Sequence, residues 1–305
     1  MDCKNKVVIL LSTYNGEKYL NEQLDSLLNQ TYKNIDIYIR DDGSKDETVN
    51  IIKKYQNEHD NIHLEEGKNL GFIKSFFELL KNSDENVDIY SYCDQDDIWE
   101  EDKIERAVKF INKEEKNIPI LYFCNSDYYD INMNFIGHAE KNKVYNFRNS
   151  LVECVTQGMT MCINKKTRDL IVNNIPENTL FHDWWTYMIC SGLGKVIYDE
   201  KSCVKYRRHN KSVTVEGKNF VELQIWRIKK FLIGDSLKTI KKQIIEYSKL
   251  YKEKLNDENK KIISLFDNEK YSFKLAIKKL FYPKRFRRKL SDECMLRILF
   301  LLGKL

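Results

Sequence analysis

The stretch VDIYSYCDQDDIWEED (residues 87–102) determines how the rest of the chain is interpreted. Its apolar run from Val87 to Cys93 ends in three acids within DQDD, residues 94–97. Such a run is typical of a buried strand, and the C-terminal edge of an open α/β sheet is where ligands bind. Crowded carboxylates repel one another unless they share a cation, and Mg²⁺ and Mn²⁺ prefer oxygen ligands. The stretch predicts either a divalent-metal site or an acidic loop in which Asp97 caps a helix beginning near Ile98.

Composition indicates a folded protein with one large or two modest domains. The chain has 305 residues, 42% of them hydrophobic and only 3 of them proline, so it is not of the disordered class. Its 8 cysteines include no CxxC pair, which predicts buried, reduced thiols in the cytoplasm and no zinc site. We expect no signal peptide, no membrane-spanning helix and no nucleic-acid partner.

Charge divides the chain into two parts. Residues 219–305 hold 22 Lys and Arg against 10 Asp and Glu, whereas residues 1–218 hold 29 against 36. An acidic body with a basic tail predicts two regions with different partners. We therefore expect one domain over 1–218 and a helical, basic region over 219–305.

Strand-like and helix-like segments alternate along the first part of the chain. This alternation predicts an α/β fold with a mostly parallel sheet. Two acid-rich turns, RDDGS (residues 40–44) and DQDD, follow strands and should meet at one edge of the sheet. The expected strands cover residues 6–11, 35–39, 62–64, 87–93 and 120–124, and the expected helices cover residues 20–28, 46–55 and 71–80.

Five short motifs, in order, carry a family resemblance. The chain reads STYNGEKYL from residue 12, IRDDGSKDET from residue 39, CDQDD from residue 93, FHDWW from residue 181 and YRRHN from residue 206. Together they resemble a family 2 glycosyltransferase, closest to the bacterial rhamnosyltransferase-like branch, over about residues 5–215. The resemblance implies the Rossmann-like GT-A fold, here with a helical C-terminal extension.

The resemblance also implies a nucleotide-sugar site at the sheet edge. The first strand-to-helix turn would hold the base and ribose, with the two acids of DDGS completing the base site. Asp96 would bind Mn²⁺ or Mg²⁺, and Asp94 would bind the metal or the ribose. From the residues alone, Asn15-Gly16 can be a plain turn and DDGS a helix cap. The expected nucleotide-binding residues are Ser12, Thr13, Tyr14, Asn15, Glu17, Asp41, Asp42 and Asp94.

Three later segments would complete the active site by the same resemblance. Asp183 would be the catalytic base, and the flat rings of Trp184 and Trp185 would contact sugar or belong to the core. Gln157 and Gly158 would line the acceptor side.

The motif YRRHN would act on the metal and the phosphates. His209 would be a third metal ligand or a donor to the pyrophosphate, and Arg207 and Arg208 would pair with phosphates. A surface basic cluster is the alternative.

The function implied is an inverting, metal-dependent hexosyltransferase. It would move L-rhamnose from dTDP-rhamnose to a saccharide on a polyprenyl diphosphate lipid, for cell-surface polysaccharide. The alternatives are a transferase that uses a UDP-sugar and a non-catalytic saccharide-binding protein. A nucleotidyltransferase would carry a Gly-rich, basic loop after the first strand, which STYNGEKY does not provide.

The basic tail contains an amphipathic pattern. The apolar residues at helical spacing are Phe273, Ile277, Leu280 and Phe281, and the lysines expected on the opposite side are Lys274, Lys278 and Lys279. This pattern predicts a helix on an anionic membrane surface, at the inner face of the plasma membrane. Packing on the catalytic domain or on a second copy in a homodimer is the alternative.

Overall fold

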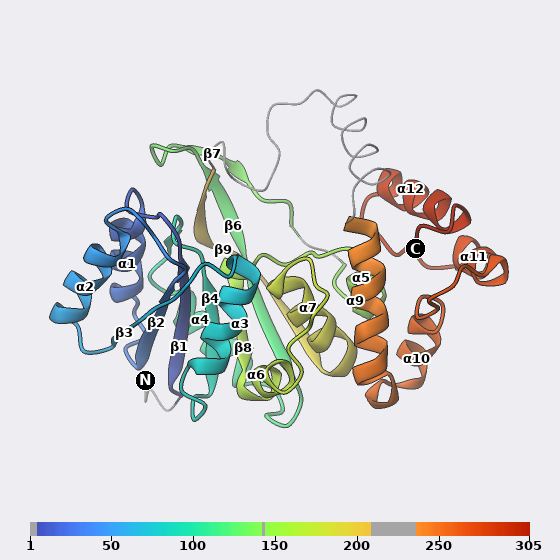
Figure 1. Ribbon diagram of the computed structural model, residues 1–305, viewed down its shortest axis with the longest axis horizontal. Helices are drawn as coiled ribbons and strands as arrows, with labels where there is room; N and C mark the ends of the chain where they lie inside the picture. The colour runs from blue at the N-terminus through green and yellow to red at the C-terminus, as the bar shows by residue number, and fades with distance from the viewer. Residues whose placement is uncertain (1–4, 142–143, 209–235) are drawn as a thin grey trace. The chain divides into compact units, whose positions relative to one another are not determined.

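The computed structural model describes residues 5–141, 144–208 and 236–305 (Figure 1). The chain forms two compact units, each built from separate stretches of sequence. Residues 144–155 and 176–193 pack with the C-terminal helices. Unit 1 comprises Met1–Asn142, Thr156–Ile175 and Gly194–Arg208, and unit 2 comprises Lys143–Val155, Pro176–Leu193 and His209–Leu305.

Unit 1 is organised around one mixed sheet with the order β3-β2-β1-β4-β8-β6-β9-β5, and β7 pairs with β6. The first four strands in this order run parallel, as do β6 and β9, whereas β8 runs antiparallel to both of its neighbours. The strands are β1 (Val7–Thr13), β2 (Ile35–Asp41), β3 (Ile62–Glu66), β4 (Ile89–Cys93), β5 (Ile98–Trp99), β6 (Ile120–Tyr129), β7 (Phe135–His138), β8 (Met161–Asn164) and β9 (Lys195–Arg207).

Helices flank this sheet and bury their apolar sides against it. Leu20, Leu24 and Leu27 of α1 lie in the core with the strands, as their i, i+4, i+7 spacing predicts. The mixed α/β architecture confirms the predicted fold class. The helices are α1 (Leu20–Leu28), α2 (Thr48–Glu58), α3 (Phe72–Asn82), α4 (Lys103–Ile111) and α6 (Lys165–Val172), with a short 3₁₀ turn η1 (Gly158–Thr160).

The helix expected near Ile98 begins later, so the helix-cap interpretation of Asp97 is wrong. Ile98 and Trp99 instead form β5, which pairs with Lys205 and Val204 of β9. The next helix, α4, begins at residue 103. In the sequence alone, the short apolar pair directly after the acids predicts the start of a helix, because its strand partner on β9 is distant in sequence.

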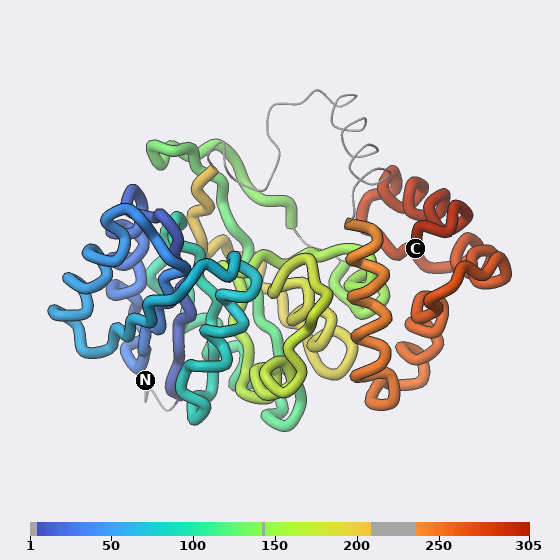
Figure 2. The backbone as a smooth tube through the Cα atoms, viewed as in Figure 1, coloured from blue at the N-terminus to red at the C-terminus, as the bar shows by residue number. Residues whose placement is uncertain are grey.

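Unit 2 is helical in the described residues and has an aromatic core. The Trp185 and Tyr247 rings lie 5.8 Å apart and those of Phe147 and Tyr247 lie 5.6 Å apart, so α5, α7 and α9 share one core. Figure 2 shows α7 and α9 running side by side although they are far apart in sequence. The elements are α5 (Phe147–Ser150), α7 (His182–Leu193), α9 (Ser236–Tyr251), η2 (Lys252–Lys254), α10 (Asp257–Ile263), α11 (Phe273–Leu280) and α12 (Leu290–Leu301).

The helix α7, which belongs to unit 2, is buried on nearly all sides. Its residues include Trp184, Trp185 and Met188, all buried. A helix that is apolar all round must be covered on every face. In the described ranges, no helix combines the length and the low polarity needed to cross a bilayer.

Burial of His182 links the stability of unit 2 to pH. The imidazole is fully buried, and this burial lowers its pKa from 6.5 to about 3. In the unfolded chain the same group takes up a proton below about pH 6.5. Between about pH 6.5 and pH 3, therefore, only the unfolded state takes up a proton at His182. This uptake stabilises the unfolded state relative to the folded state as the pH falls.

We predict that His182→Leu reduces the loss of stability on acidification. Between pH 6.5 and pH 5, the wild-type free energy of unfolding should fall by about 1.6 kcal/mol more than that of the variant, because the slope rises from half toward all of about 1.4 kcal/mol per pH unit as the unfolded histidine becomes fully protonated. Urea unfolding followed by tryptophan fluorescence at several pH values measures this difference. Parallel pH dependences in the two proteins would contradict it.

Candidate active site

Three loops converge at one edge of the sheet in unit 1. They follow the parallel strands β1, β2 and β4, and the pairing of Thr13 with Asp41 and of Leu11 with Cys93 brings the strand ends together. This convergence is what the sequence predicts for parallel strands. The loops are joined by side-chain hydrogen bonds rather than only lying side by side.

The loop after β1 is tied to the DQDD loop through Gln95. The Tyr14 N–H donates to Gln95 Oε1 at 2.8 Å, and Gln95 Nε2 donates back to the Tyr14 carbonyl at 3.1 Å. A Cβ on Gly16 would lie 2.3 Å from that same Oε1, so the close approach requires glycine. The Tyr14 side chain is 45% exposed beside this contact. Sequence reasoning singled out the acids of DQDD and missed the residue between them.

The same loop is also tied to the loop after β2. Asn15, whose φ of 48° lies in the left-handed region that asparagine tolerates, donates its N–H to Ser44 Oγ at 2.8 Å. Its Oδ1 accepts from the Lys45 N–H at 2.9 Å. Glu17 accepts from the Glu47 N–H at 2.9 Å. Asn15 and Glu17 are therefore built into the joint between the two loops.

Asp41 is buried and holds its own turn in shape. Its Oδ1 accepts from Thr13 Oγ1 at 3.0 Å and from Ser44 Oγ at 2.5 Å. Its Oδ2 accepts from the N–H groups of Gly43 and Ser44 at 3.0 and 2.8 Å. Gly43, with a φ of 84°, supplies the left-handed conformation this turn requires.

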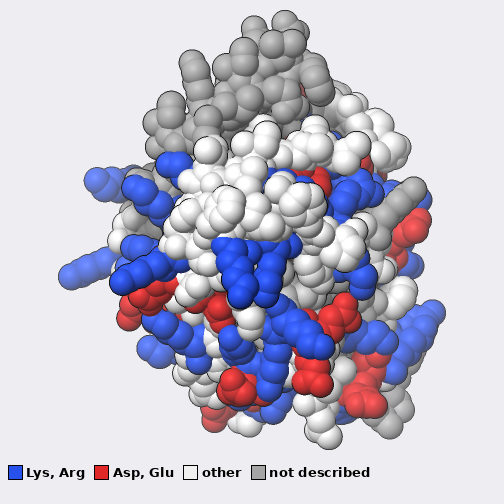
Figure 3. Space-filling view, turned by 90° about the vertical axis from the view of Figure 1, so that its right-hand side faces the viewer, with Lys and Arg blue, Asp and Glu red and all other residues white. Residues whose placement is uncertain are grey.

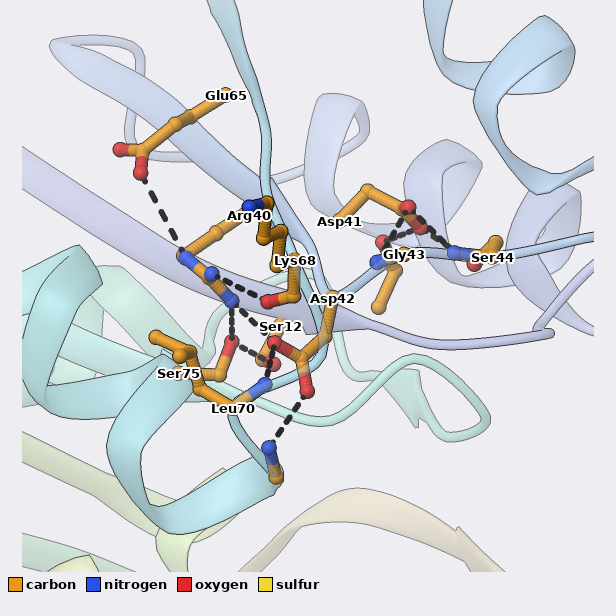
Figure 4. Close-up of polar contacts among 12 residues, drawn as sticks. Ser12, Arg40, Asp41, Asp42, Gly43, Ser44, Glu65, Lys68, Leu70 and Ser75 are labelled. Carbon is orange, nitrogen blue, oxygen red and sulfur yellow. Dashed lines mark hydrogen bonds and ion pairs between the residues drawn. The ribbon is translucent and has the colours of Figure 1, made fainter.

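Asp42 forms a buried ion pair with Arg40, a residue that sequence reasoning did not single out (Figure 4). Its Oδ1 accepts from Arg40 Nη1 at 2.5 Å and from the Leu70 N–H at 2.8 Å. Its Oδ2 accepts from the Gly71 N–H at 2.8 Å, at the start of α3. Arg40 Nη1 also donates to Ser75 Oγ at 3.1 Å. Removing one partner of such a pair costs about 3–5 kcal/mol, because the other charge stays buried.

The network reaches β1 through a pair of hydroxyl groups. Ser12 Oγ and Ser75 Oγ lie 2.7 Å apart, so the expected nucleotide-binding residue Ser12 is joined to the same cluster as Asp42. The loops after β1 and β2 and the start of α3 thus form one hydrogen-bonded assembly.

The DQDD loop places its three acids in different environments. Asp94 and Asp96 are partly exposed, and Asp97 is fully buried. Asp97 Oδ1 accepts from the Arg207 N–H at 3.1 Å, whereas its Oδ2 has no hydrogen-bond partner in the described part of the chain. Burial and the charges of Asp96 and Asp94 raise the pKa of the Asp97 carboxyl well above its usual range.

Arg207 anchors this loop from the end of β9. Its Nε donates to the Asp96 carbonyl at 3.0 Å, its Nη1 donates to the Ile131 carbonyl at 3.2 Å, and its Nη2 pairs with Glu22. Its guanidinium also lies 4.6 Å from the centre of the Tyr19 ring. Arg207 is buried, and each of its three guanidinium nitrogens donates within the protein. It therefore positions the loop, and the phosphate contact expected for it stays a prediction.

The loop has the donor set that a hard divalent cation prefers. Three carboxylates within four residues, one with an unpartnered buried oxygen, would be stabilised by Mg²⁺ or Mn²⁺. In the described ranges, the DQDD loop included, no three His, Cys, Asp or Glu side chains lie close enough together to hold a metal ion by themselves. The expected third ligand, His209, lies outside the described residues.

The remaining expected residues of unit 1 lie directly after β9 and at the start of η1. The Arg208 guanidinium lies 3.6 Å from the centre of the Tyr128 ring. Gln157 Oε1 accepts from Ser126 Oγ at 3.0 Å, and Gly158 begins η1. Gln157 is therefore joined to β6, in the same unit as the acidic loop.

The FHDWW motif lies in unit 2, in the first turn of α7. Asp183 is partly buried and is the second residue of that helix, so it is not the residue that caps it. Trp184 Nε1 donates to the Ser150 carbonyl at 2.6 Å, and Trp185 is fully buried against Tyr247. Both tryptophans are buried in unit 2, and the contact with sugar expected for them stays a prediction.

Known proteins with similar sequences are glycosyltransferases. The model for Glycosyl transferase family 2 matches residues 8–170. The chain is 32% identical over 219 residues to the dTDP-rhamnosyl transferase RfbG of Shigella flexneri, covering 65% of this chain and 71% of that protein. It is 26% identical over 225 residues to an uncharacterized glycosyltransferase of Rickettsia typhi, covering 71% and 68% respectively.

Solved structures share the fold at low sequence identity. Residues 1–349 of S. aureus TarS in complex with UDP-GlcNAc match with a TM-score of 0.62 and 17% identity, over 98% of this chain and 79% of that one. The mannosyltransferase PcManGT from Pyrobaculum calidifontis, in complex with GDP-Man and Mn²⁺, matches with a TM-score of 0.52 and 12% identity, over 99% and 87%.

The family match includes all three loops that meet at the sheet edge and covers more than half of the chain. This protein therefore belongs to glycosyl transferase family 2, has the GT-A fold and is a glycosyltransferase.

Proposed function

We propose that the chain is an inverting, metal-dependent glycosyltransferase that moves L-rhamnose from dTDP-rhamnose to a lipid-linked saccharide. The observation that carries this proposal is the set of three loops bonded to one another at the sheet edge, with acids in the DQDD loop. Similarity to RfbG, named as a dTDP-rhamnosyl transferase, supports this donor. A UDP-sugar donor is the alternative, because TarS shares the fold and binds UDP-GlcNAc.

The donor nucleotide would bind where the loops after β1 and β2 meet. The half-exposed ring of Tyr14 offers an apolar face to a pyrimidine. Thr13 and Asp41 already form a hydrogen bond with each other, so the base would meet a rigid surface. A preformed surface lowers the ordering cost of binding. Ser12 and Asp42, which belong to the same network, would contribute to base recognition and to its support.

Asp94 and Asp96 would hold Mn²⁺ or Mg²⁺, and His209 is proposed as a further ligand. When bound, the metal offsets the negative charge of the departing nucleoside diphosphate. The Mn²⁺ in PcManGT shows that one enzyme of this fold binds such a metal. Arg207 keeps the Asp96 backbone in place through its Nε donor, and Arg208 is proposed to meet the phosphates.

Asp183 is proposed as the catalytic base. It would accept the proton of the acceptor hydroxyl while that oxygen bonds to the anomeric carbon of the donor sugar. On the opposite side, the bond from this carbon to the diphosphate oxygen would break, which inverts the configuration. Asp183 lies in the first turn of α7, where the helix dipole favours the carboxylate form. Gln157 and Gly158 are proposed to line the acceptor side.

The lipid-linked acceptor places the proposed reaction at a membrane surface. We propose that the enzyme acts as a peripheral protein at the inner face of the plasma membrane. The product would be a longer saccharide on the same lipid, for cell-surface polysaccharide.

We predict that Asp96→Asn removes the effect of metal on donor binding. Wild-type affinity for dTDP should rise more than about tenfold when Mn²⁺ is added, and the variant should bind dTDP equally with and without it. Calorimetric titration measures both affinities. Asp60→Asn, at an exposed position, is the matched control and should behave as the wild type. A normal Mn²⁺ response in Asp96→Asn would remove the metal assignment.

Asp183→Asn should separate binding from chemistry. The variant should fold and bind donor normally, while kcat falls by about 10²–10⁴-fold because the acceptor proton has no base to take it. Turnover measured by release of nucleoside diphosphate, with circular dichroism as the folding control, tests this expectation. Near-normal turnover would falsify the base role.

The donor can be identified by thermal shift with Mn²⁺ present. A preferred nucleotide-sugar at about 100 times its Kd should stabilise the protein by about 2.7 kcal/mol, which is several degrees in Tm. We expect dTDP-rhamnose to give the largest shift among dTDP-, UDP- and GDP-sugars. A larger shift with a UDP-sugar would establish the alternative donor.

A further inference from the structure

The outer side of α12 is apolar although it faces solvent. Its inner side, with Leu296 and Phe300, is buried in unit 2. On the opposite side, Leu290, Ile298 and Leu302 are exposed, at 65%, 58% and 58%. A helix with apolar residues on both sides is typical of one that is covered on both sides. The outer side of α12 therefore lacks a cover within the described residues.

A second exposed apolar group comes from α11. Phe273 and Phe281, at the two ends of this helix, are 65% and 75% exposed. Its opposite side is buried, because Ala276 lies in the core and Lys279 Nζ donates to the Leu305 carbonyl at 2.7 Å. The large exposed side chains are thus on the outside of a helix that is already packed.

The two helices form one rigid support. Arg297 of α12 donates to the carbonyls of Leu280 and Tyr282, at the end of α11. The Tyr271 hydroxyl donates to the Leu301 carbonyl at 3.1 Å. We call their exposed apolar surface the α11–α12 face, which consists of Phe273, Phe281, Leu290, Ile298, Leu301 and Leu302.

Basic side chains accompany this face. Residues 271–305 contain ten Lys and Arg against two acids, and one of these acids, Glu293, is buried and bonded to Arg297. Figure 3 looks onto α10, α11 and α12 and shows an uncharged area bordered by Lys and Arg side chains. The exposed basic residues of this stretch are Lys274, Lys278, Lys284, Arg285, Lys289 and Lys304.

We infer that the α11–α12 face binds the surface of an anionic lipid bilayer. Its apolar side chains would enter the boundary between headgroups and acyl chains, and the lysines and arginines would meet lipid phosphates. Two kinds of contact are needed for stable attachment, and this surface provides both. The excess of positive charge matches a negatively charged membrane.

A second copy of the chain fits this surface less well. A two-fold dimer brings the same surface of each copy together, so it would place the two basic borders next to each other. Like charges in contact oppose association by several kcal/mol. The charge of the region thus favours lipid over self-association.

This inference names the surface that would bind the membrane, and it rests on the proposed function only for the location of the enzyme at a membrane. Vesicle binding is measured without donor or acceptor, so loss of lipid binding and loss of transferase activity are separate results.

The test uses the full chain and sedimentation with vesicles of phosphatidylglycerol and phosphatidylcholine, or of phosphatidylcholine alone. We expect binding to the anionic vesicles only, weakened at 0.5 M salt because the attraction is screened. Phe281→Ser with Ile298→Ser should weaken binding about tenfold or more through lost apolar burial. Lys274→Gln with Lys278→Gln should weaken it about fivefold for each residue.

Matched changes on unit 1 are the controls. Phe135→Ser with Ile136→Ser removes two apolar side chains of similar exposure, and Lys33→Gln with Lys54→Gln removes two exposed lysines. Both control proteins should bind vesicles as the wild type does. Circular dichroism and the Tm of each variant establish that it is folded.

Two results would overturn the inference. The first is that the wild-type protein does not bind anionic vesicles, or that folded α11–α12 variants bind them with unchanged affinity. The other is light scattering that shows a wild-type dimer and monomeric α11–α12 variants together with equal lipid binding, which would make this face a contact between copies of the chain.

Discussion

Buried carboxylates must be matched by donors, and this constraint organises the active-site edge of the sheet. Asp41 and Asp42 lie at the end of β2 with almost no contact with water. Asp41 takes donors from β1 and from its own turn, and Asp42 takes donors from Arg40 and from the start of α3. These hydrogen bonds fix the paths of three segments: the loop after β1, the loop after β2 and the start of α3. A ligand that binds there finds a surface already ordered by the fold, so little of its binding energy is spent on ordering loops.

Arg207 plays the corresponding part for the DQDD loop. It comes from the far end of a long strand, and its backbone and side chain bond to Asp97 and Asp96. Burial first, and then the charges of Asp96 and Asp94, raise the pKa of the Asp97 carboxyl, so the acids of this loop also repel one another. A loop of this kind needs a rigid attachment to keep its exposed acids in position when no cation is present. Arg207 therefore holds the loop in position and provides a nearby positive charge.

The parts of the fold that depend on local pattern were predictable from sequence. Apolar runs and leucine spacing predicted the parallel strands and α1, and parallel pairing predicted that RDDGS and DQDD meet. Long-range pairing was not predictable: β5 exists because Ile98 pairs with Lys205, so the expected helix begins later. Gln95 was missed because its partner, Tyr14, lies far away in sequence. Arg40 was missed because Ser75 and the Lys68 carbonyl, which complete its buried contacts, are also distant in sequence. The tryptophans beside Asp183 carry no sequence pattern that separates a sugar contact from a core contact, and the packing of Trp185 against Tyr247 depends on residues far away in sequence.

The two interpretations of the C-terminal region, packing within the protein and binding to a membrane surface, are compatible. Lys279 lies on the lysine-rich side of the predicted amphipathic helix, yet burial against Phe266 and Phe300 lowers its pKa to about 8. The helix is thus rotated relative to the simple pattern: a lysine faces the core and phenylalanines face outward. Packing and surface exposure use different sides of the same helix. An arrangement that buries a lysine and exposes Phe281 costs free energy in water, and contact with lipid headgroups would recover part of that cost.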